Sequence, residues 1–144
     1  MWLKVVDYFK NEPNVIGYDI INEPTGGNFW KNPYAFIGPD QNNNRLLLPF
    51  YKKISKEIRK IEKDKLLLFE PSPADMIGGF YENFSEYTNK DLLNYHTYCP
   101  FSKSLGSNKC QLYNYLYVKR RQENIHKLSI GGIVSEFGSV PNSP

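Results

Sequence analysis

Helical periodicity marks three segments of the chain. Apolar residues of the first nine positions share one face of a helix, which we expect to end before Pro13 because the residue that precedes a proline is disfavoured in helical conformation. A second amphipathic pattern predicts a helix that begins near Leu48 and continues through Ile61. A third helix is predicted over residues 111–126, with one side formed by Leu112, Tyr115, Leu116 and Ile125.

Short apolar runs between these helices predict four buried strands, at residues 15–21, 66–70, 92–98 and 130–134. Because near-continuous apolar strands alternate with helices, we expect an α/β fold with a parallel sheet covered on its outer face. No glycine-rich phosphate-binding motif follows any strand, so we favour a segment of an α/β barrel over half of a dinucleotide-binding fold. A closed (β/α)₈ TIM barrel takes about 250 residues. Residues 1–144 are therefore predicted to form one domain, a partial barrel of about four βα units.

Composition excludes several classes of function. The chain is 40% hydrophobic and 23% charged, as ordinary globular domains are, and its net charge of +3 is too small to argue for a nucleic-acid partner. No apolar run approaches the about 18 residues of a transmembrane span. Two cysteines cannot form a four-ligand zinc site, and His96 and His126 lie on different elements, so we expect neither a metal nor a cofactor.

The cysteines and the ends of the chain bear on its cellular setting. Free thiols are the default for Cys99 and Cys110, with a loop-closing disulfide as the alternative if the protein is secreted. The first residues lack the features of a signal peptide. The chain opens inside a helix and closes just after a strand, as a piece of a longer protein would.

A long loop at residues 25–44 carries four aromatic residues, and such loops are usually functional.

Polar side chains follow the predicted strands at the carboxyl ends, where active sites of parallel α/β folds assemble. They are Asn22, Glu23, Glu70, His96, Tyr98 and Glu136. The tripeptide Asn-Glu-Pro occurs twice, and its first copy precedes a strand. Glu12 is therefore expected at the opposite, stabilising end of the sheet, whereas Glu23 of the second copy points towards the site.

Two facing carboxyls are the minimal apparatus of glycoside hydrolysis. We expect barrel curvature to bring Glu23 and Glu136 face to face, since they follow the first and last strands. For Glu70 alone we favour a structural ion pair or loop cap, and we interpret Asp19 as a buried, hydrogen-bonded barrel residue. His96 and Tyr98 share one strand face. Tyr98 could donate to the nucleophile and His96 could contact sugar or hold the acid; the alternative is that both are core residues.

Three strings resemble the fourth, sixth and seventh strands of glycoside hydrolase family 5, the cellulase-like retaining barrels. They are Tyr18–Pro24, Asn94–Tyr98 and Ile133–Gly138. The resemblance implies that Glu23 is the general acid/base and Glu136 the nucleophile. It further implies that Asn22 binds the sugar 2-hydroxyl, that Tyr98 lies beside the nucleophile and that His96 lies in the first subsite. The family's first three strands and its eighth would lie outside this chain.

Within that family, Leu68–Pro71 and Tyr95–Pro100 look most like endoglycoceramidases and glycosylceramidases. The resemblance implies an O-glycosyl hydrolase that cuts between the glycan and the ceramide of glycosphingolipids, in a secreted or lysosome-like setting. The substrate would be the partner, with membrane-surface contact made through it. A β-glucanase or cellulase of the same family is one alternative. An inactive truncated fragment is the other, because an open four-stranded sheet leaves edges unpaired.

Overall fold

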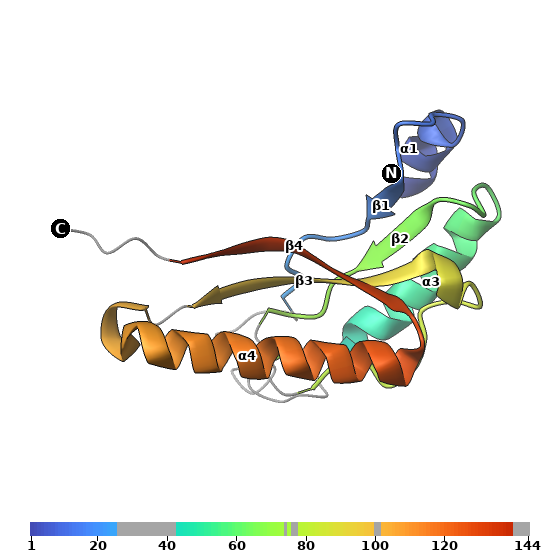
Figure 1. Ribbon diagram of the computed structural model, residues 1–144. Helices are drawn as coiled ribbons and strands as arrows, with labels where there is room; N and C mark the ends of the chain where they lie inside the picture. Colours follow the sequence, from blue (N-terminus) through green and yellow to red (C-terminus); the bar gives the residue numbers. More distant parts are fainter. Residues whose placement is uncertain (26–42, 74, 76–77, 100–101, 140–144) are drawn as a thin grey trace.

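The computed structural model describes residues 1–25, 43–73, 75, 78–99 and 102–139 (Figure 1). Its elements are α1 (Trp2–Phe9), β1 (Gly17–Asp19), a π-helix (Asn43–Leu47), α3 (Leu48–Arg59), β2 (Leu66–Phe69), a 3₁₀ helix (Thr88–Lys90), β3 (Asp91–Cys99), α4 (Ser102–Leu128) and β4 (Gly131–Ser139). The aromatic residues expected in the loop at 25–44 lie outside the described residues.

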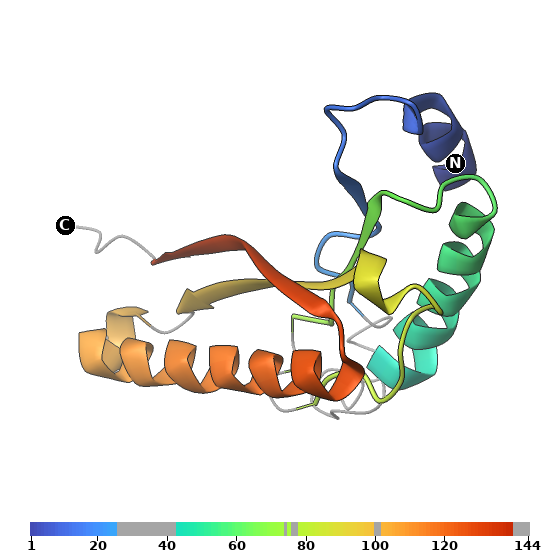
Figure 2. The ribbon, with the colours of Figure 1, turned by 45° about the vertical axis from the view of Figure 1, so that its right-hand side comes forward.

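The four strands form one parallel sheet in the order β1-β2-β3-β4, as expected. Each strand therefore pairs with the next one along the chain, and the intervening segment returns the chain to the same end of the sheet. Helices α3 and α4 lie on the same side of the sheet in both views (Figures 1 and 2). Consecutive parallel strands with helices on one side are the repeating unit of an α/β barrel.

An aromatic cluster fixes α3 against the sheet next to the end of β2. Tyr51 of α3 contacts Phe69, Phe80 and Phe84 with ring centroids 5.1 to 5.9 Å apart, and Phe69 stacks on Phe84 at 4.3 Å. All four side chains are buried. The Tyr51 hydroxyl also donates to the backbone carbonyl of Glu70 at 2.9 Å. The core therefore holds the residue that follows β2 in a defined position.

The predicted apolar side of the third helix is wrong at three of its four positions, because Leu112, Tyr115 and Leu116 are exposed, whereas Ile125 packs against the core. The buried residues in the described part of α4 are Tyr117, Arg121, Asn124 and Leu128. Two of these are polar and each has a specific partner. Asn124 accepts from the backbone N–H of Phe80 and donates to its carbonyl, and Arg121 contacts Asp75. Apolar periodicity misses such a face because the partners come from distant segments.

Strand and helix lengths also differ from the prediction. α4 begins at Ser102 rather than near residue 111, and β1 is limited to Gly17–Asp19. β4 continues to Ser139, because it pairs with β3 along most of its length. Glu136 therefore lies within a paired strand instead of following it, whereas His96 lies within β3, as the predicted strand at residues 92–98 has it.

Gly17 is required where β1 approaches β2. A Cβ atom at this position would lie 2.6 Å from the backbone oxygen of Leu66, its neighbour in the ladder, and backbone cannot yield as a side chain can. We expect Gly17→Ala to lower the free energy of unfolding by about 1–3 kcal/mol, measured by chemical denaturation. Lys53→Ala, on the exposed side of α3, is the control and should stay within about 0.5 kcal/mol of the parent. A neutral Gly17→Ala would contradict this packing.

Candidate active site

A β-bulge sets the direction of Glu136. Tyr95 pairs with Val134 but His96 pairs with Glu136, so Ser135 is an extra residue on β4. A regular ladder would place Ser135 opposite His96 and turn Glu136 to the other face of the sheet. The bulge therefore places Glu136 beside His96 and Tyr98, which share one face of β3. The Tyr98 hydroxyl donates to Glu136 Oε2 at 2.9 Å.

Glu23 is held in an unusual backbone conformation after β1. Its φ of 42° lies in the left-handed region, which non-glycine residues rarely adopt and which clusters at functional sites. Its N–H donates to Glu70 Oε2 at 2.8 Å. Glu70 thus caps this turn, as its interpretation as a loop cap expects. Asn22, directly before Glu23, is exposed, and Glu12 lies at the opposite end of β1, where its side chain accepts from Asn14.

His96 lies between three carboxyl groups. Its Nδ1 is 2.9 Å from Glu23 Oε1 and 3.5 Å from Glu136 Oε2. Its Nε2 is 3.4 Å from Glu70 Oε1 and 3.1 Å from the Ser135 hydroxyl. Burial by itself would lower the pKa of His96, but the hydrogen bond to Glu23 and the charges of Glu70 and Glu136 outweigh it and raise the pKa. The imidazolium form is therefore favoured between the carboxylates.

The two glutamates of the predicted pair converge on this histidine. One carboxylate oxygen of Glu23, one of Glu136 and a ring nitrogen of His96 all lie within 4.8 Å of one another. In a flat sheet, three steps of about 4.8 Å would separate β1 from β4 by about 14 Å. The convergence therefore reflects the curvature of the sheet, with the carboxyls on its concave side. Oxygen atoms this close are compatible with the carboxyl separation of about 5–5.5 Å that is typical of retaining glycosidases.

A layer of buried polar groups lies beneath the pair. Asn94 of β3 donates to Asp19 Oδ2 at 2.6 Å and to Glu70 Oε1 at 2.9 Å. Glu70 is buried, with an exposed fraction of 2%. This burial and the neighbouring Asp19 carboxylate raise the pKa of Glu70 to about 7. The hydrogen bond from the Glu23 N–H and the charge of His96 lower this pKa, but their effect is smaller. Partial burial likewise raises the pKa of the Asp19 carboxyl, so the protonation states of Glu70 and Asp19 depend on each other.

Asp19 is hydrogen-bonded as expected, but it is exposed rather than buried. The reason is that β1 forms an edge of the described sheet, so its concave side has a neighbouring strand on one side alone. Asn94 was missed as a site residue. Asn94 lies two residues before His96 and four residues before Tyr98. Because alternate residues of a strand share one face, this spacing could have identified Asn94 as a site residue.

A cavity of about 200 Å³ opens beside this cluster. Its walls include Glu23, Glu70, His96 and Tyr98, together with Tyr113 and Tyr117 of α4. Glu23 and Glu136 each keep more than two fifths of their side chains exposed, whereas His96 keeps 7%. The carboxylates are therefore accessible to a ligand from the concave side, while the histidine that joins them is fixed.

The same three groups could offer ligand atoms to a cation. Within the described ranges, Glu23, His96 and Glu136 form the one group of three such residues close enough to do so. However, Tyr98 donates to Glu136, and His96 bridges the carboxylates. The negative charges are thus already compensated by protein donors. The arrangement suits proton transfer and nucleophilic attack by carboxylates.

Cys110 is disulfide-bonded, and the described residues include no free cysteine. The expectation of free thiols is therefore wrong for this residue. Bonding depends on spatial approach and on the redox compartment, neither of which a sequence pattern contains. None of the helices in the described part of the chain has the length and apolar character that crossing a bilayer demands.

The raised pKa of Glu70 predicts a pH effect on stability. Because the pKa of this carboxyl is raised from 4.5 to about 7 in the folded state, ionising it disfavours folding. We expect the free energy of unfolding to fall as the pH rises from about 4.5 to about 7, and Glu70→Gln to flatten this slope, measured by chemical denaturation across that range. The control is Glu12→Gln, which removes a carboxyl from the opposite end of β1. An unchanged slope in Glu70→Gln would contradict the assignment.

Comparison with known proteins gives one consistent result. The family model for cellulase, glycosyl hydrolase family 5, matches residues 1–144. An endoglycoceramidase of Hydra vulgaris is 35% identical in an alignment 144 positions long that covers 96% of this chain and 26% of that protein. An endoglycoceramidase of Cyanea nozakii is 30% identical over the same shares. The chain therefore spans about a quarter of the length of the curated relatives it matches.

Solved structures give the same fold. Endo-glycoceramidase II from Rhodococcus sp. in a five-membered iminocyclitol complex aligns with a TM-score of 0.75 and 19% identity. Its cellobiose-like imidazole complex aligns with a TM-score of 0.73 and 20% identity. Both alignments cover 99% of this chain and 33% of the other. The described sheet is therefore part of a (β/α)₈ barrel, as the alternation of strands and helices predicted.

Proposed function

Because the chain belongs to the cellulase family, glycosyl hydrolase family 5, we propose that it carries the catalytic carboxylates of a retaining O-glycosyl hydrolase. The observation that supports this most directly is the approach of Glu23 and Glu136 to within 4.8 Å on the concave side of the sheet. At this separation one carboxylate reaches the anomeric carbon while the other reaches the glycosidic oxygen, with no room left for an intervening water molecule.

Glu136 is the nucleophile in this proposal. It lies within a paired strand, and its Oε2 accepts from the Tyr98 hydroxyl, which orients the carboxylate. Attack on the anomeric carbon forms a glycosyl ester and releases the leaving oxygen. Tyr98 keeps its proton for this role, because the hydrogen bond to Glu136 raises the pKa of its hydroxyl.

Glu23 is the general acid and base. It gives its proton to the leaving oxygen and then takes one from the water molecule that hydrolyses the ester. The His96 side chain joins Glu23 to Glu136, and its positive charge offsets the repulsion of the two carboxylates when both are ionised. Asn22, which is exposed directly before Glu23, binds the sugar 2-hydroxyl in this proposal.

We propose a glycosphingolipid as the substrate, cut between the glycan and the ceramide. The Hydra and Cyanea relatives are endoglycoceramidases, and one solved structure of the Rhodococcus enzyme is a ganglioside GM3 complex. An apolar ceramide would bring the protein to a membrane surface through its substrate. A disulfide at Cys110 supports an oxidising compartment, as in a secreted or lysosomal protein.

The test is the product of hydrolysis. With a ganglioside as substrate, we expect free ceramide and an intact oligosaccharide by mass spectrometry. NMR during the first minutes should show the oligosaccharide with the configuration of the substrate. Reducing sugar released from cellulose without ceramide release would instead identify a β-glucanase. An inverted first product would overturn the retaining mechanism, and turnover of none of these substrates would favour an inactive chain.

A further inference from the structure

A second cavity, of about 720 Å³, lies between α3 and residues 83–87, the segment that precedes the 3₁₀ helix and β3. It shares no lining residue with the candidate active site. Five of its eleven lining residues are basic and one, Glu86, is acidic; the basic residues are Lys52, Lys56, Arg59, Lys60 and Lys63. We refer to this cavity as the basic cleft. Its size lies within the about 300–1,000 Å³ of small-molecule sites.

The basic residues follow one side of α3 and its C-terminal extension. Lys52, Lys56 and Arg59 are spaced by four and three positions and so share one face of α3, and Lys60 and Lys63 line the cleft from the segment that follows the helix. With a rise of 1.5 Å per residue, Lys52 and Lys56 are about 6 Å apart along the axis, and Arg59 follows about 4.5 Å later. A ligand in the cleft therefore meets a row of positive charges instead of a single one.

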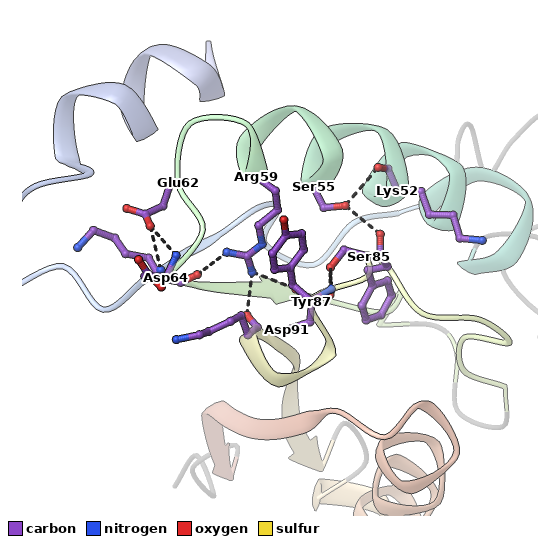
Figure 3. A network of polar contacts seen from close by, with 11 residues as sticks. Lys52, Ser55, Arg59, Glu62, Asp64, Ser85, Tyr87 and Asp91 are labelled. Atoms are coloured by element: carbon purple, nitrogen blue, oxygen red, sulfur yellow. Dashed lines mark hydrogen bonds and ion pairs between the residues drawn. The ribbon is translucent and has the colours of Figure 1, made fainter.

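Arg59 gives the row a rigid member. Its guanidinium donates to the carbonyls of Lys65 at 2.7 Å and Lys90 at 3.1 Å, and pairs with Asp91 at 3.1 Å (Figure 3). It also lies 5.3 Å from the centroid of the Tyr87 ring. Only 4% of the residue is exposed. Contacts from three segments thus fix this charge at the wall of the cleft before any ligand binds.

The lysines around Arg59 remain available. Lys52 pairs with Glu82 and Lys60 with Glu57, but all four side chains are well exposed, and ion pairs screened by water in this way are weak. Lys56 and Lys63 have no ion-pair partner in the described part of the chain. Two unpaired and two weakly paired ammonium groups can therefore turn towards an anion in the cleft.

We propose that the basic cleft binds an anion that carries two or more phosphate groups. Ammonium and guanidinium groups are the side chains that bind phosphate oxygens in proteins. The spacing of about 6 Å along α3 suits phosphates on neighbouring positions of one molecule. Such groups occur in free polyphosphates and in the headgroups of phosphorylated lipids, and the chemistry of recognition is the same for both.

Calorimetry at 150 mM salt tests the proposal with two probes. One is inorganic tripolyphosphate, and the other is phosphatidylcholine vesicles that contain phosphatidylinositol bisphosphate. We expect saturable one-to-one binding of at least one probe. The double variant Lys56→Glu/Lys63→Glu should weaken it at least about tenfold. Lys53→Glu/Lys119→Glu is the matched control, because it changes the net charge equally at exposed positions outside the cleft.

The control should bind within about twofold of the parent. Binding of both probes with the same loss would indicate recognition of the phosphate groups themselves, and binding of vesicles alone would identify a lipid headgroup as the source. Equal weakening in both double variants would overturn the proposal, because it would show attraction to net charge. Absence of saturable binding to either probe would overturn it as well. Unfolding curves of the variants exclude loss of the fold as the cause.

Discussion

Replacing the nucleophile, Glu136→Ala, should reduce turnover of a glycosphingolipid by at least about 10⁴-fold. Without this carboxylate no covalent glycosyl ester can form, and neither Tyr98 nor His96 can substitute, because each acts on a carboxylate that is already in place. The measurement is the rate of ceramide release by the catalytically active protein. Circular dichroism should be unchanged, since the Glu136 side chain is 44% exposed and its loss opens no buried cavity.

A small anion should restore activity to this variant. Azide fits the space left by the missing carboxylate and attacks the anomeric carbon directly, so the product is a glycosyl azide of inverted configuration. With an activated aryl glycoside, whose leaving group needs no proton, the rate should rise with azide concentration. If azide gave a product of retained configuration, the roles of Glu136 and Glu23 would have to be exchanged.

The second large effect is expected for the proton donor. Glu23→Gln should lower kcat/KM by about 10²–10⁴-fold for a natural glycosphingolipid, whose leaving oxygen requires protonation. For an activated aryl glycoside kcat/KM should change little, because that ratio reports the step in which the leaving group departs. Glutamine keeps the volume of the side chain and the backbone N–H that donates to Glu70, so the strained turn is retained.

Equal slowing of both substrates would exclude Glu23 as the proton donor. Glu70 would then be the next residue to test, because its carboxyl is protonated up to about neutral pH and lies near His96. Its burial argues against direct contact with a substrate, which is why Glu23 is the first choice.

The position of the candidate site could be predicted from sequence because the signal is local. Apolar strands alternating with amphipathic helices predict parallel order, and parallel order places the ends of all strands at one edge. The two copies of Asn-Glu-Pro illustrate this, since identical residues lie at opposite ends of β1 according to which side of the strand they occupy. Glu12 caps a turn there, whereas Glu23 lies within hydrogen-bonding distance of His96.

The remaining features depend on contacts between distant segments. The inner face of α4 holds Arg121 and Asn124, whose burial becomes favourable only with Asp75 and Phe80 as partners. The layer beneath the carboxylates is similar, because Asn94 joins Asp19 to Glu70 across three strands. The spacing within one element can indicate which face Asn94 lies on, but it does not report which residues of other elements are its partners.

The bulge at Ser135 has an evolutionary consequence, because it gives β4 one residue more than its partner strand needs. A deletion of Val134 or Ser135 would leave a regular ladder in which Glu136 still lies opposite His96. An insertion between Glu136 and Gly138 has no such compensation, because another residue would then replace Gly138 beside the Tyr98 ring. The ring leaves no space for a residue larger than glycine at this position unless it shifts. Loss of a residue before the carboxylate would therefore keep its alignment with His96, whereas an insertion after it would disturb the pairing of Gly138 with Tyr98.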